Sequence, residues 1–391
     1  MTDLDTRTAD PASASPAGAV AAPAGEGAGG AGRPRRLRVG VVGGGFMSRV
    51  HTAAARAAGA EVVAVASSSA ERAGVAADEL GIPTGHASVA DLVADPSVDV
   101  VHVCSPNALH AEHALAALAA GKHVVCEKPL ATTPDEADEL ARAAAAAGLV
   151  AAVPFVYRFH PMVREARARV ASGEVGRVLS VRGSYLQDWL LGADDVDWRV
   201  DADLGGPSRA FADIGSHLVD LLEFVVGDRV ARVSALTSTV HERRGGTPVT
   251  TEDEAAVVFA TVGGAIGTLF VSQVAPGRKN RLVLDVAGSA ESLEFSQEEP
   301  ETLWIGRRRG SELLPREAAQ LSDDAARLSV VPAGHPLGYV DAFAAFVRDV
   351  HDAVRGAAPE GLPTFADGRR AVRVTAAVLE SARTGAWVDV P

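Results

Sequence analysis

Short runs of β-branched residues alternate with alanine-rich stretches over residues 37–153 of the sequence. Strands that alternate with helices in this way predict βαβ units, whose strands lie parallel in one sheet. Thr133, Pro134 and Glu136 supply an N-cap, a first-turn proline and a capping-box glutamate for one helix. Gly121 and Gly148 occupy positions typical of C-terminal glycine caps. The predicted strands of this doubly wound α/β domain span residues 37–42, 61–66, 98–104, 123–126 and 149–153.

The pattern changes after about residue 154, where long segments of alternating polarity follow a helical stretch at residues 162–172. Strand after strand without intervening helices predicts a large, mostly antiparallel sheet, and helical patterns return at residues 339–355 and 368–384. An open sheet face of this kind needs a partner subunit or a polar surface. The predicted strands here span residues 179–187, 229–240, 254–261, 265–274 and 281–287.

Three regions follow from these patterns. Residues 1–34 are dominated by Ala, Gly, Pro, Ser and Thr without apolar periodicity, and are predicted to be a disordered tail. Residues 35–153 are predicted to form a dinucleotide-binding Rossmann domain. Residues 154–391 are predicted to form an α+β domain for substrate binding and oligomerisation.

The composition excludes several classes of protein. The formal net charge of -13 argues against a nucleic-acid-binding surface, which needs a basic footprint. No run of about 18 consecutive apolar residues predicts a transmembrane helix. Two cysteines, Cys104 and Cys126, are too few for a disulfide framework or a zinc cluster. We expect them to be reduced, packed thiols in a cytoplasmic protein that binds no metal.

A glycine-rich segment follows the first predicted strand and opens a helix. Gly43 and Gly45 fit the first two glycines of the dinucleotide fingerprint, and Ser48 is small enough for the third position. Phe46 and Met47 begin the helix, whose free N–H groups would hold a pyrophosphate. The alternative is a simple tight turn, but the strand–turn–helix context favours an NAD(P) site.

The second predicted strand ends without the acidic residue that NAD-specific folds place near the ribose. Ser67 and Ser68 stand there, with Arg72 one turn into the next helix. Serines with a nearby arginine suit a 2′-phosphate, so NADP is favoured over NAD. The alternative is that these residues form a solvated turn with no role in cofactor binding. Another segment follows the predicted strand at residues 98–104. Asn107 and His110 of this segment are expected, with Ser105, to contact the ribose or the nicotinamide. His110 suits an ordinary helix-capping role equally well.

Two further motifs carry polar groups suited to proton and charge transfer. Glu127, Lys128 and Pro129 follow a predicted strand, so Lys128 would lie at the mouth of the sheet, where it can polarise a reacting oxygen. Asp213 and His217 are four residues apart and would share one face of a helix. Histidine titrates near neutrality, which suits proton transfer, although a helical Asp/His pair is more often structural.

Together, these motifs resemble the glucose-fructose oxidoreductase / inositol dehydrogenase / rhizopine-catabolism (Gfo/Idh/MocA) family from about residue 37 to the C-terminus. The most specific element is Glu127-Lys128-Pro129 followed about 85 residues later by Asp213-x-Gly-x-His217. The resemblance implies that His217 takes the alcohol proton. It implies that Lys128 polarises the oxygen and that Asp213 orients the substrate and the histidine.

The resemblance also implies roles for residues outside these motifs. Tyr157, Arg158, Trp198 and Arg199 match positions that line the nicotinamide and substrate side in the family. Segments 185–189 and 335–339 look closest to members that oxidise glycosides and anhydrosugars. The implied cofactor residues include Glu127, Lys128, Trp198 and Arg199, and the implied substrate residues are Lys128, Tyr157, Gln187, Trp189, Asp213 and His217.

The expected function is NAD(P)-dependent oxidation of a secondary ring hydroxyl of a sugar, glycoside, anhydrosugar or inositol, or reduction of the corresponding ketone. Two alternatives remain open from the sequence. One is a glycosidase that retains NAD and works by oxidation, elimination and reduction. The other is a non-catalytic sugar or cofactor sensor, which the presence of all three catalytic-type residues disfavours. Family members form dimers or tetramers through an open sheet, so a homo-oligomer is expected.

Overall fold

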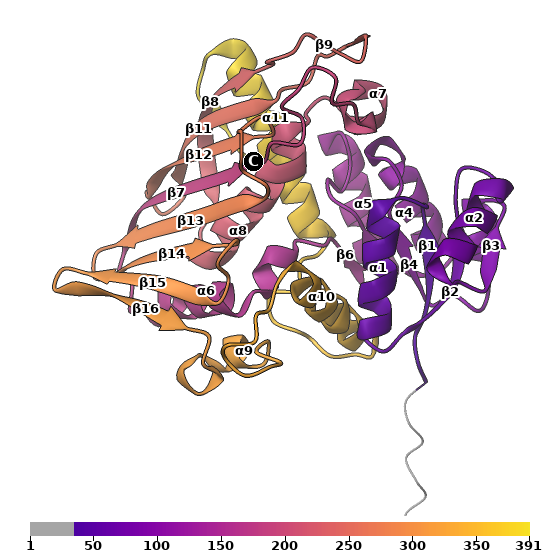
Figure 1. Ribbon diagram of the computed structural model, residues 1–391, viewed down its shortest axis with the longest axis horizontal. Helices are drawn as coiled ribbons and strands as arrows, with labels where there is room; N and C mark the ends of the chain where they lie inside the picture. The colour runs from indigo at the N-terminus through magenta and orange to yellow at the C-terminus, as the bar shows by residue number, and fades with distance from the viewer. Residues whose placement is uncertain (1–34) are drawn as a thin grey trace, which may run out of the picture. The chain divides into compact units, whose positions relative to one another are not determined.

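The computed structural model describes residues 35–391, and the tail predicted for residues 1–34 lies outside the described residues (Figure 1). In the first half of the described chain, six parallel strands form one sheet in the order β3-β2-β1-β4-β5-β6. The strands are β1 (Arg38–Val42), β2 (Glu61–Ala66), β3 (Thr84–His86), β4 (Val100–Val103), β5 (His123–Cys126) and β6 (Ala151–Ala152). The helices between them are α1 (Phe46–Ala57), α2 (Ala70–Leu80), α3 (Val89–Ala94), α4 (His110–Ala119) and α5 (Pro134–Ala147).

Helix α5 begins and ends at the residues that the sequence predicts. The Thr133 side chain accepts a hydrogen bond from the Glu136 N–H at the start of α5, and the Glu136 side chain completes the capping box. Gly148 ends the helix in the left-handed conformation, with φ 63°. The sequence did not predict β3, because its three residues, Thr-Gly-His, contain no apolar run.

The second half contains a nine-stranded sheet in the order β16-β15-β14-β13-β7-β12-β11-β8-β17. The neighbours β7 and β12 run parallel, and the other pairs are antiparallel. The predicted fold class, a Rossmann sheet joined to a large, mostly antiparallel sheet, is therefore confirmed. The strands are β7 (Val178–Leu186), β8 (Val230–Ser238), β11 (Glu254–Thr261), β12 (Ile266–Ser272), β13 (Arg281–Gly288), β14 (Ser292–Ser296), β15 (Thr302–Arg307), β16 (Gly310–Pro315) and β17 (Val388–Asp389), and β9 (Arg243–Arg244) pairs with β10 (Thr247–Pro248) in a separate hairpin.

Helices cover one face of this sheet (Figure 1). Apolar side chains of α6 (Pro161–Ser172), α8 (Ser216–Val226) and α11 (Phe365–Thr384) share one core with the sheet. Residues that alternate with these core positions face the other way, and several large apolar ones are exposed. They are Leu236, Val258, Ile266, Phe270, Trp304 and Leu313. None of the helices within residues 35–391 is long and apolar enough to cross a membrane.

The last two long helices follow the second sheet in the chain but contribute to the cores of the Rossmann half. Helix α10 (Tyr339–Val354) contributes Phe343, Phe346 and Val347 to the core around β1 and α1, and it lies beside α1 in Figure 1. Helix α11 contributes Phe365 and Val372 to the core around β5 and α5. A division of the chain at residue 153 therefore separates the two sheets but not their hydrophobic cores. Short helices at Ala202–Gly205 (α7) and Asp323–Ala326 (α9) complete the fold.

Candidate active site

The turn between β1 and α1 requires glycine at its first position. Gly43 has φ 123°, which L side chains rarely adopt, and a Cβ there would lie 2.6 Å from the backbone oxygen of Cys104. Gly45 is the N-cap of α1, and a Cβ there would meet no protein atom within 4 Å. The first glycine is therefore needed by the protein itself, whereas the second keeps open the space in front of the helix N-terminus.

Alanine at these two positions is expected to have different effects. Gly43→Ala should lower the melting temperature of the cofactor-free protein, because strain of about 1–3 kcal/mol is typical for a forced left-handed residue. Gly45→Ala should leave that melting temperature unchanged and weaken NADH binding at least about tenfold, because its methyl group would enter the space that a pyrophosphate needs. Thermal unfolding and NADH fluorescence titration measure the two effects. Wild-type NADH affinity in Gly45→Ala would contradict this account.

A cavity of about 950 Å³ opens in front of this turn. Ligand pockets are typically about 300–1,000 Å³, so a dinucleotide fits within it. We call it the large cavity. All of the residues predicted to bind the cofactor line it, which are Gly43, Gly45, Phe46, Met47, Ser67, Ser68, Arg72, Ser105, Asn107, His110, Glu127, Lys128, Trp198 and Arg199.

Ser68 and Arg72 lie together at one end of the large cavity. The Arg72 guanidinium donates a hydrogen bond of 3.2 Å to the Ser68 hydroxyl. Ser69 caps α2 by accepting from the Arg72 backbone N–H at 3.2 Å. Glu71 also lines the cavity, but it belongs to the first turn of α2 and not to the end of β2. This end therefore presents hydroxyl groups and a guanidinium to a ribose, together with the carboxylates of Glu71 and Glu79 from α2.

His110 lines the large cavity, but both of its ring nitrogens contact the backbone. Nδ1 is 2.7 Å from the carbonyl oxygen of Pro129, and Nε2 is 2.9 Å from that of Ser105. The ring thus ties together the segments that follow β4 and β5, which is the structural role left open by the sequence. Asn107 donates to the carbonyl oxygen of Gly205 at 2.9 Å and so connects the Rossmann half to α7.

Lys128 and Asp213 form an ion pair at the other end of the large cavity. The Lys128 ammonium donates to an Asp213 carboxylate oxygen and, at 3.0 Å, to the Asp213 backbone oxygen. Gln273 donates to the second carboxylate oxygen at 2.8 Å, and the Arg199 Nε lies 4.0 Å from the first. Burial raises the pKa of Asp213, but the positive charges of Lys128 and Arg199 outweigh it and lower the pKa to about 2.

His217 lies close to this pair without a hydrogen bond to Asp213. The segment Phe211–Gly215 winds as a π-helical turn ahead of α8, and both carboxylate oxygens of Asp213 are held by Lys128 and Gln273. The predicted orientation of the histidine by Asp213 is therefore not what the geometry provides. Burial, followed by the charge of Lys128, lowers the pKa of His217 to about 3, so its imidazole is uncharged near neutral pH.

Aromatic side chains stand around His217, and two of them join a hydrogen-bond network with amide side chains. The Tyr157 ring stands edge-on to the imidazole with the ring centroids 5.1 Å apart. The hydroxyl groups of Tyr157 and Tyr185 are hydrogen-bonded, and Tyr185 donates to Asn280 at 2.7 Å. Gln187 donates to the same Asn280 oxygen at 2.8 Å, and Trp189 donates to Gln187 at 2.8 Å. The three residues predicted to bind substrate on this side, Tyr157, Gln187 and Trp189, thus belong to one network.

The sequence did not single out Gln273 and Asn280 for the site, although both contact predicted site residues. Each lies next to a strand end, Gln273 after β12 and Asn280 before β13, which is the one signal that would have drawn attention to them. Arg158 lies elsewhere. Its buried guanidinium pairs with Asp220 and Asp367 and does not line the large cavity.

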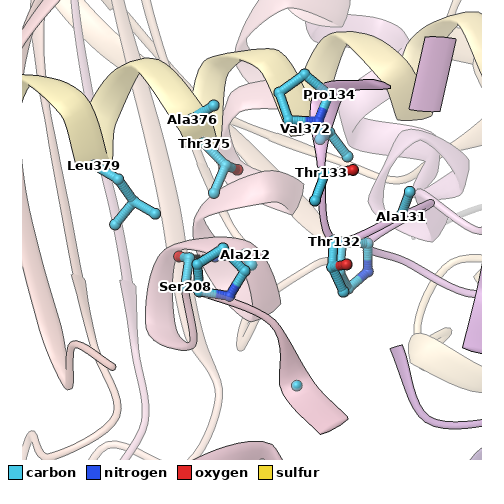
Figure 2. Close-up of a pocket in the computed structure, with 13 residues that line it drawn as sticks. Ala131, Thr132, Thr133, Pro134, Ser208, Ala212, Val372, Thr375, Ala376 and Leu379 are labelled. Atoms are coloured by element: carbon cyan, nitrogen blue, oxygen red, sulfur yellow. Dashed lines mark hydrogen bonds between the residues drawn. The ribbon is translucent and has the colours of Figure 1, made fainter. Parts of the chain in front are cut away.

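A smaller cavity of about 130 Å³ lies beside the segments that follow Lys128 and precede Asp213 (Figure 2). The hydroxyl groups of Thr132, Ser208 and Thr375 at its wall are all hydrogen-bonded within the protein. Methyl and methylene groups therefore dominate its lining. It is too small for a dinucleotide.

Comparison with known proteins agrees with this geometry. Residues 37–155 match the family described as "Oxidoreductase family, NAD-binding Rossmann fold", and residues 163–294 match the "GFO/IDH/MocA C-terminal domain". The levoglucosan dehydrogenase of Pseudarthrobacter phenanthrenivorans is 32% identical over 91% of this chain and 99% of its own length. A Haloferax volcanii D-xylose 1-dehydrogenase (NADP(+)) is 42% identical over 44% of this chain and 51% of its own length.

Solved structures extend the likeness to the whole fold. Levoglucosan dehydrogenase in complex with NADH and L-sorbose superposes with a TM-score of 0.85 at 32% identity, covering 91% of this chain and 99% of that one. An inositol dehydrogenase homologue from Azotobacter vinelandii in complex with NAD+ gives a TM-score of 0.83 at 28% identity, covering 91% and 98%. The chain therefore belongs to the Gfo/Idh/MocA family of NAD(P)-dependent oxidoreductases, with an NAD-binding Rossmann domain in its first half.

Proposed function

We propose that this enzyme oxidises a secondary ring hydroxyl of a sugar, glycoside, anhydrosugar or inositol, or reduces the corresponding ketone, with Lys128, Asp213 and His217 as its catalytic residues. One observation carries the proposal. The ammonium of Lys128 lines a cavity large enough for a dinucleotide, pairs with Asp213, and lies close enough to the uncharged imidazole of His217 to lower its pKa. Residues 35–153 would hold the cofactor, and residues 154–391 would supply the substrate side and the oligomer interface.

The cofactor, when bound, supplies the acceptor for the hydride that leaves the C–H bond of the alcohol. His217 takes the hydroxyl proton, and Lys128 donates a hydrogen bond to the same oxygen as it becomes a carbonyl. A weakly basic imidazole is sufficient, because the hydroxyl becomes strongly acidic as the hydride leaves. Asp213 holds the Lys128 ammonium in place. The products are a ketone, NAD(P)H and one proton.

The side chains that would face the substrate suit a polyhydroxylated ring. Tyr157 stands beside His217, and its hydroxyl belongs to a network with the amide groups of Asn280 and Gln187. Trp189 adds an aromatic surface with an N–H donor. Such a combination suits a sugar, which has hydroxyl groups around its edge and C–H bonds on its faces. The names of the relatives, a levoglucosan dehydrogenase and a D-xylose dehydrogenase, point to the same substrate class.

An absorbance screen at the reduced-nicotinamide band tests the proposal. The enzyme is mixed with NAD+ or NADP+ and with each member of a panel of pyranosides, anhydrosugars, free sugars and inositols. We expect reduced cofactor to accumulate with at least one of them and not with substrates blocked at the reacting hydroxyl. Turnover of a glycoside without net accumulation of reduced cofactor would instead support the glycosidase that retains NAD.

We also propose that the enzyme is a cytoplasmic homodimer or homotetramer built on the open face of the nine-stranded sheet. Val258, Ile266 and Phe270 of β11 and β12 are exposed there, although a monomer would more readily carry polar residues. Cys104 and Cys126 are both free thiols, which agrees with a reducing compartment.

The double variant Ile266→Arg/Phe270→Arg is expected to be a folded monomer, because two charges would have to be buried in the proposed interface. Light scattering coupled to size exclusion measures the mass. Val340→Arg, at an equally exposed apolar position of α10 outside the sheet, is the matched control and should keep the wild-type mass. A monomeric wild type, or an oligomeric double variant, would rule out this interface.

A further inference from the structure

Glu127 is a buried carboxylate at the same end of the large cavity as Lys128. It is 5% exposed, and both of its oxygens are hydrogen-bonded. One lies 2.9 Å from Nε2 of His51, and the other accepts from the Lys128 backbone N–H at 3.0 Å. Within residues 35–391 no lysine or arginine forms a salt bridge with Glu127, whereas Lys128 is paired with Asp213. Glu127 thus lacks a permanent cationic partner among the described side chains.

Two buried histidines continue from Glu127 into the Rossmann half. Nδ1 of His51, in α1, is 3.0 Å from Nδ1 of His102, in β4, and both rings are fully buried. An ionised Glu127 only accepts, so His51 donates through Nε2. His51 then accepts at Nδ1 from the N–H of His102. Burial lowers the pKa of His102 well below its usual value, in agreement with an uncharged ring.

The surroundings keep Glu127 ionised. Burial raises the pKa of this carboxyl, but the hydrogen bond from His51 and the charges around it outweigh burial and hold the pKa below its usual range. Loss of the His51 donor would remove the largest of the effects that lower this pKa, so the pKa would rise. The titratable and charged groups that interact with Glu127, from every element around it, are His51, Lys128, His110, Cys104, Cys126, His217 and Tyr339.

The position of Glu127 along the large cavity indicates which part of the cofactor it would face. The sheet order β2-β1-β4-β5 places Ser68 and Arg72, which follow β2, at one end, the glycine turn after β1 next, and Glu127 and Lys128 after β5 at the other end. The end formed by Glu127 and Lys128 is therefore left for the nicotinamide. The oxidised nicotinamide ring carries a positive charge that the reduced ring lacks. A buried carboxylate beside it would therefore interact differently with the two forms.

We propose that His51, itself held by His102, is a positioning residue that keeps Glu127 as a fixed negative charge at the nicotinamide end, and that this charge makes the enzyme bind oxidised cofactor more tightly than it otherwise would. The inference rests on the cofactor half of the proposed function and not on its substrate. Glu127 supplies the counter-charge for the oxidised ring, and the two histidines prevent that carboxyl from taking up a proton.

The test compares Kd values for oxidised and reduced cofactor, by calorimetry and NADH fluorescence, from acidic to alkaline pH. Glu127→Gln keeps the shape of the side chain without its charge. We expect it to weaken binding of the oxidised form about tenfold at all pH values, with little change for the reduced form. His51→Leu should show the same selective loss only at the acidic end, because a Glu127 carboxyl with a raised pKa regains its charge at higher pH.

His51→Gln and Phe343→Leu separate positioning from packing. The glutamine amide can donate where Nε2 of His51 does, so His51→Gln should restore most of the binding of the oxidised form. Phe343 stands edge-on to the His51 ring with the centroids 4.8 Å apart, and Phe343→Leu removes this contact but leaves the hydrogen bond to Glu127. It should lower thermal stability without changing the ratio of the two Kd values.

Equal weakening of both cofactor forms in Glu127→Gln would overturn the proposal, as would a His51→Leu variant whose Kd ratio matches the wild type at every pH. If His51→Leu does not fold, Glu127→Gln and His51→Gln still decide the question. These binding measurements need no sugar, so failure of every substrate in the absorbance screen would contradict the proposed function while leaving this inference standing.

Discussion

His217→Ala and Lys128→Met are each expected to lower kcat at least about a hundredfold, the usual scale for groups that transfer protons or polarise the reacting oxygen. His217 is the uncharged imidazole at the site, and its low pKa leaves it able to accept a proton at mildly acidic as well as neutral pH. Lys128 carries the ammonium that faces the same end of the large cavity. Steady-state kinetics with a substrate found in the screen measures both effects.

Matched variants show whether such losses arise from the chemistry or from the fold. Lys122→Met removes an ammonium that donates to the backbone oxygens of Asp95 and Val98 and does not line the large cavity. His351→Ala removes another fully buried histidine, which lies in α10. Both should keep kcat near the wild-type value at a temperature where they are folded. Near-normal kcat in folded His217→Ala or Lys128→Met would remove that residue from the mechanism.

Arg72→Ala is expected to weaken NADP binding about tenfold or more while leaving NAD binding nearly unchanged. An arginine–phosphate hydrogen bond contributes roughly 1.5–3 kcal/mol, and even the lower figure is about tenfold in Kd. The Arg72 guanidinium already lies against the Ser68 hydroxyl at the cavity wall, so it is positioned for a 2′-phosphate. Calorimetric titration of both cofactors into both proteins measures the selectivity.

Arg56→Ala is the control for this experiment, because Arg56 is an exposed arginine of the neighbouring helix α1 that donates to the backbone oxygen of Gly81 and does not line the cavity. It should leave both affinities unchanged. A wild type that clearly prefers NAD, with a preference unaltered by Arg72→Ala, would contradict the account. Hydroxyl groups or backbone amides would then hold the ribose without help from the guanidinium.

The features that the sequence predicted depend on local chemistry. The glycine turn follows from backbone conformation, since Gly43 needs a positive φ and close approach to Cys104. The start of α5 follows from its capping box. Lys128 was predicted at the mouth of the sheet because it directly follows a strand, and parallel strands end on the same side.

The features that the sequence missed depend on long-range contacts. Gln273 and Asn280 reach the site because β12 and β13 both pair with β7, and no local pattern specifies those pairings. The chain from Glu127 through His51 to His102 joins three elements that lie far apart in the sequence. Helical spacing placed Asp213 and His217 on one face, and the family resemblance implied that Asp213 orients His217. The π-helical turn and the Lys128 and Gln273 contacts direct the carboxylate elsewhere.

The central claim is direct hydride transfer from a ring carbon to NAD(P)+ with release of the reduced cofactor. A substrate from the screen, deuterated at the carbon that bears the reacting hydroxyl, tests it in a single measurement. Mass spectrometry of the free cofactor and the sugar product then follows the label. We predict one molecule of deuterated NAD(P)H for each molecule of ketone. Product formation with the deuterium retained in the sugar or lost to water, and no labelled cofactor in solution, would contradict the claim.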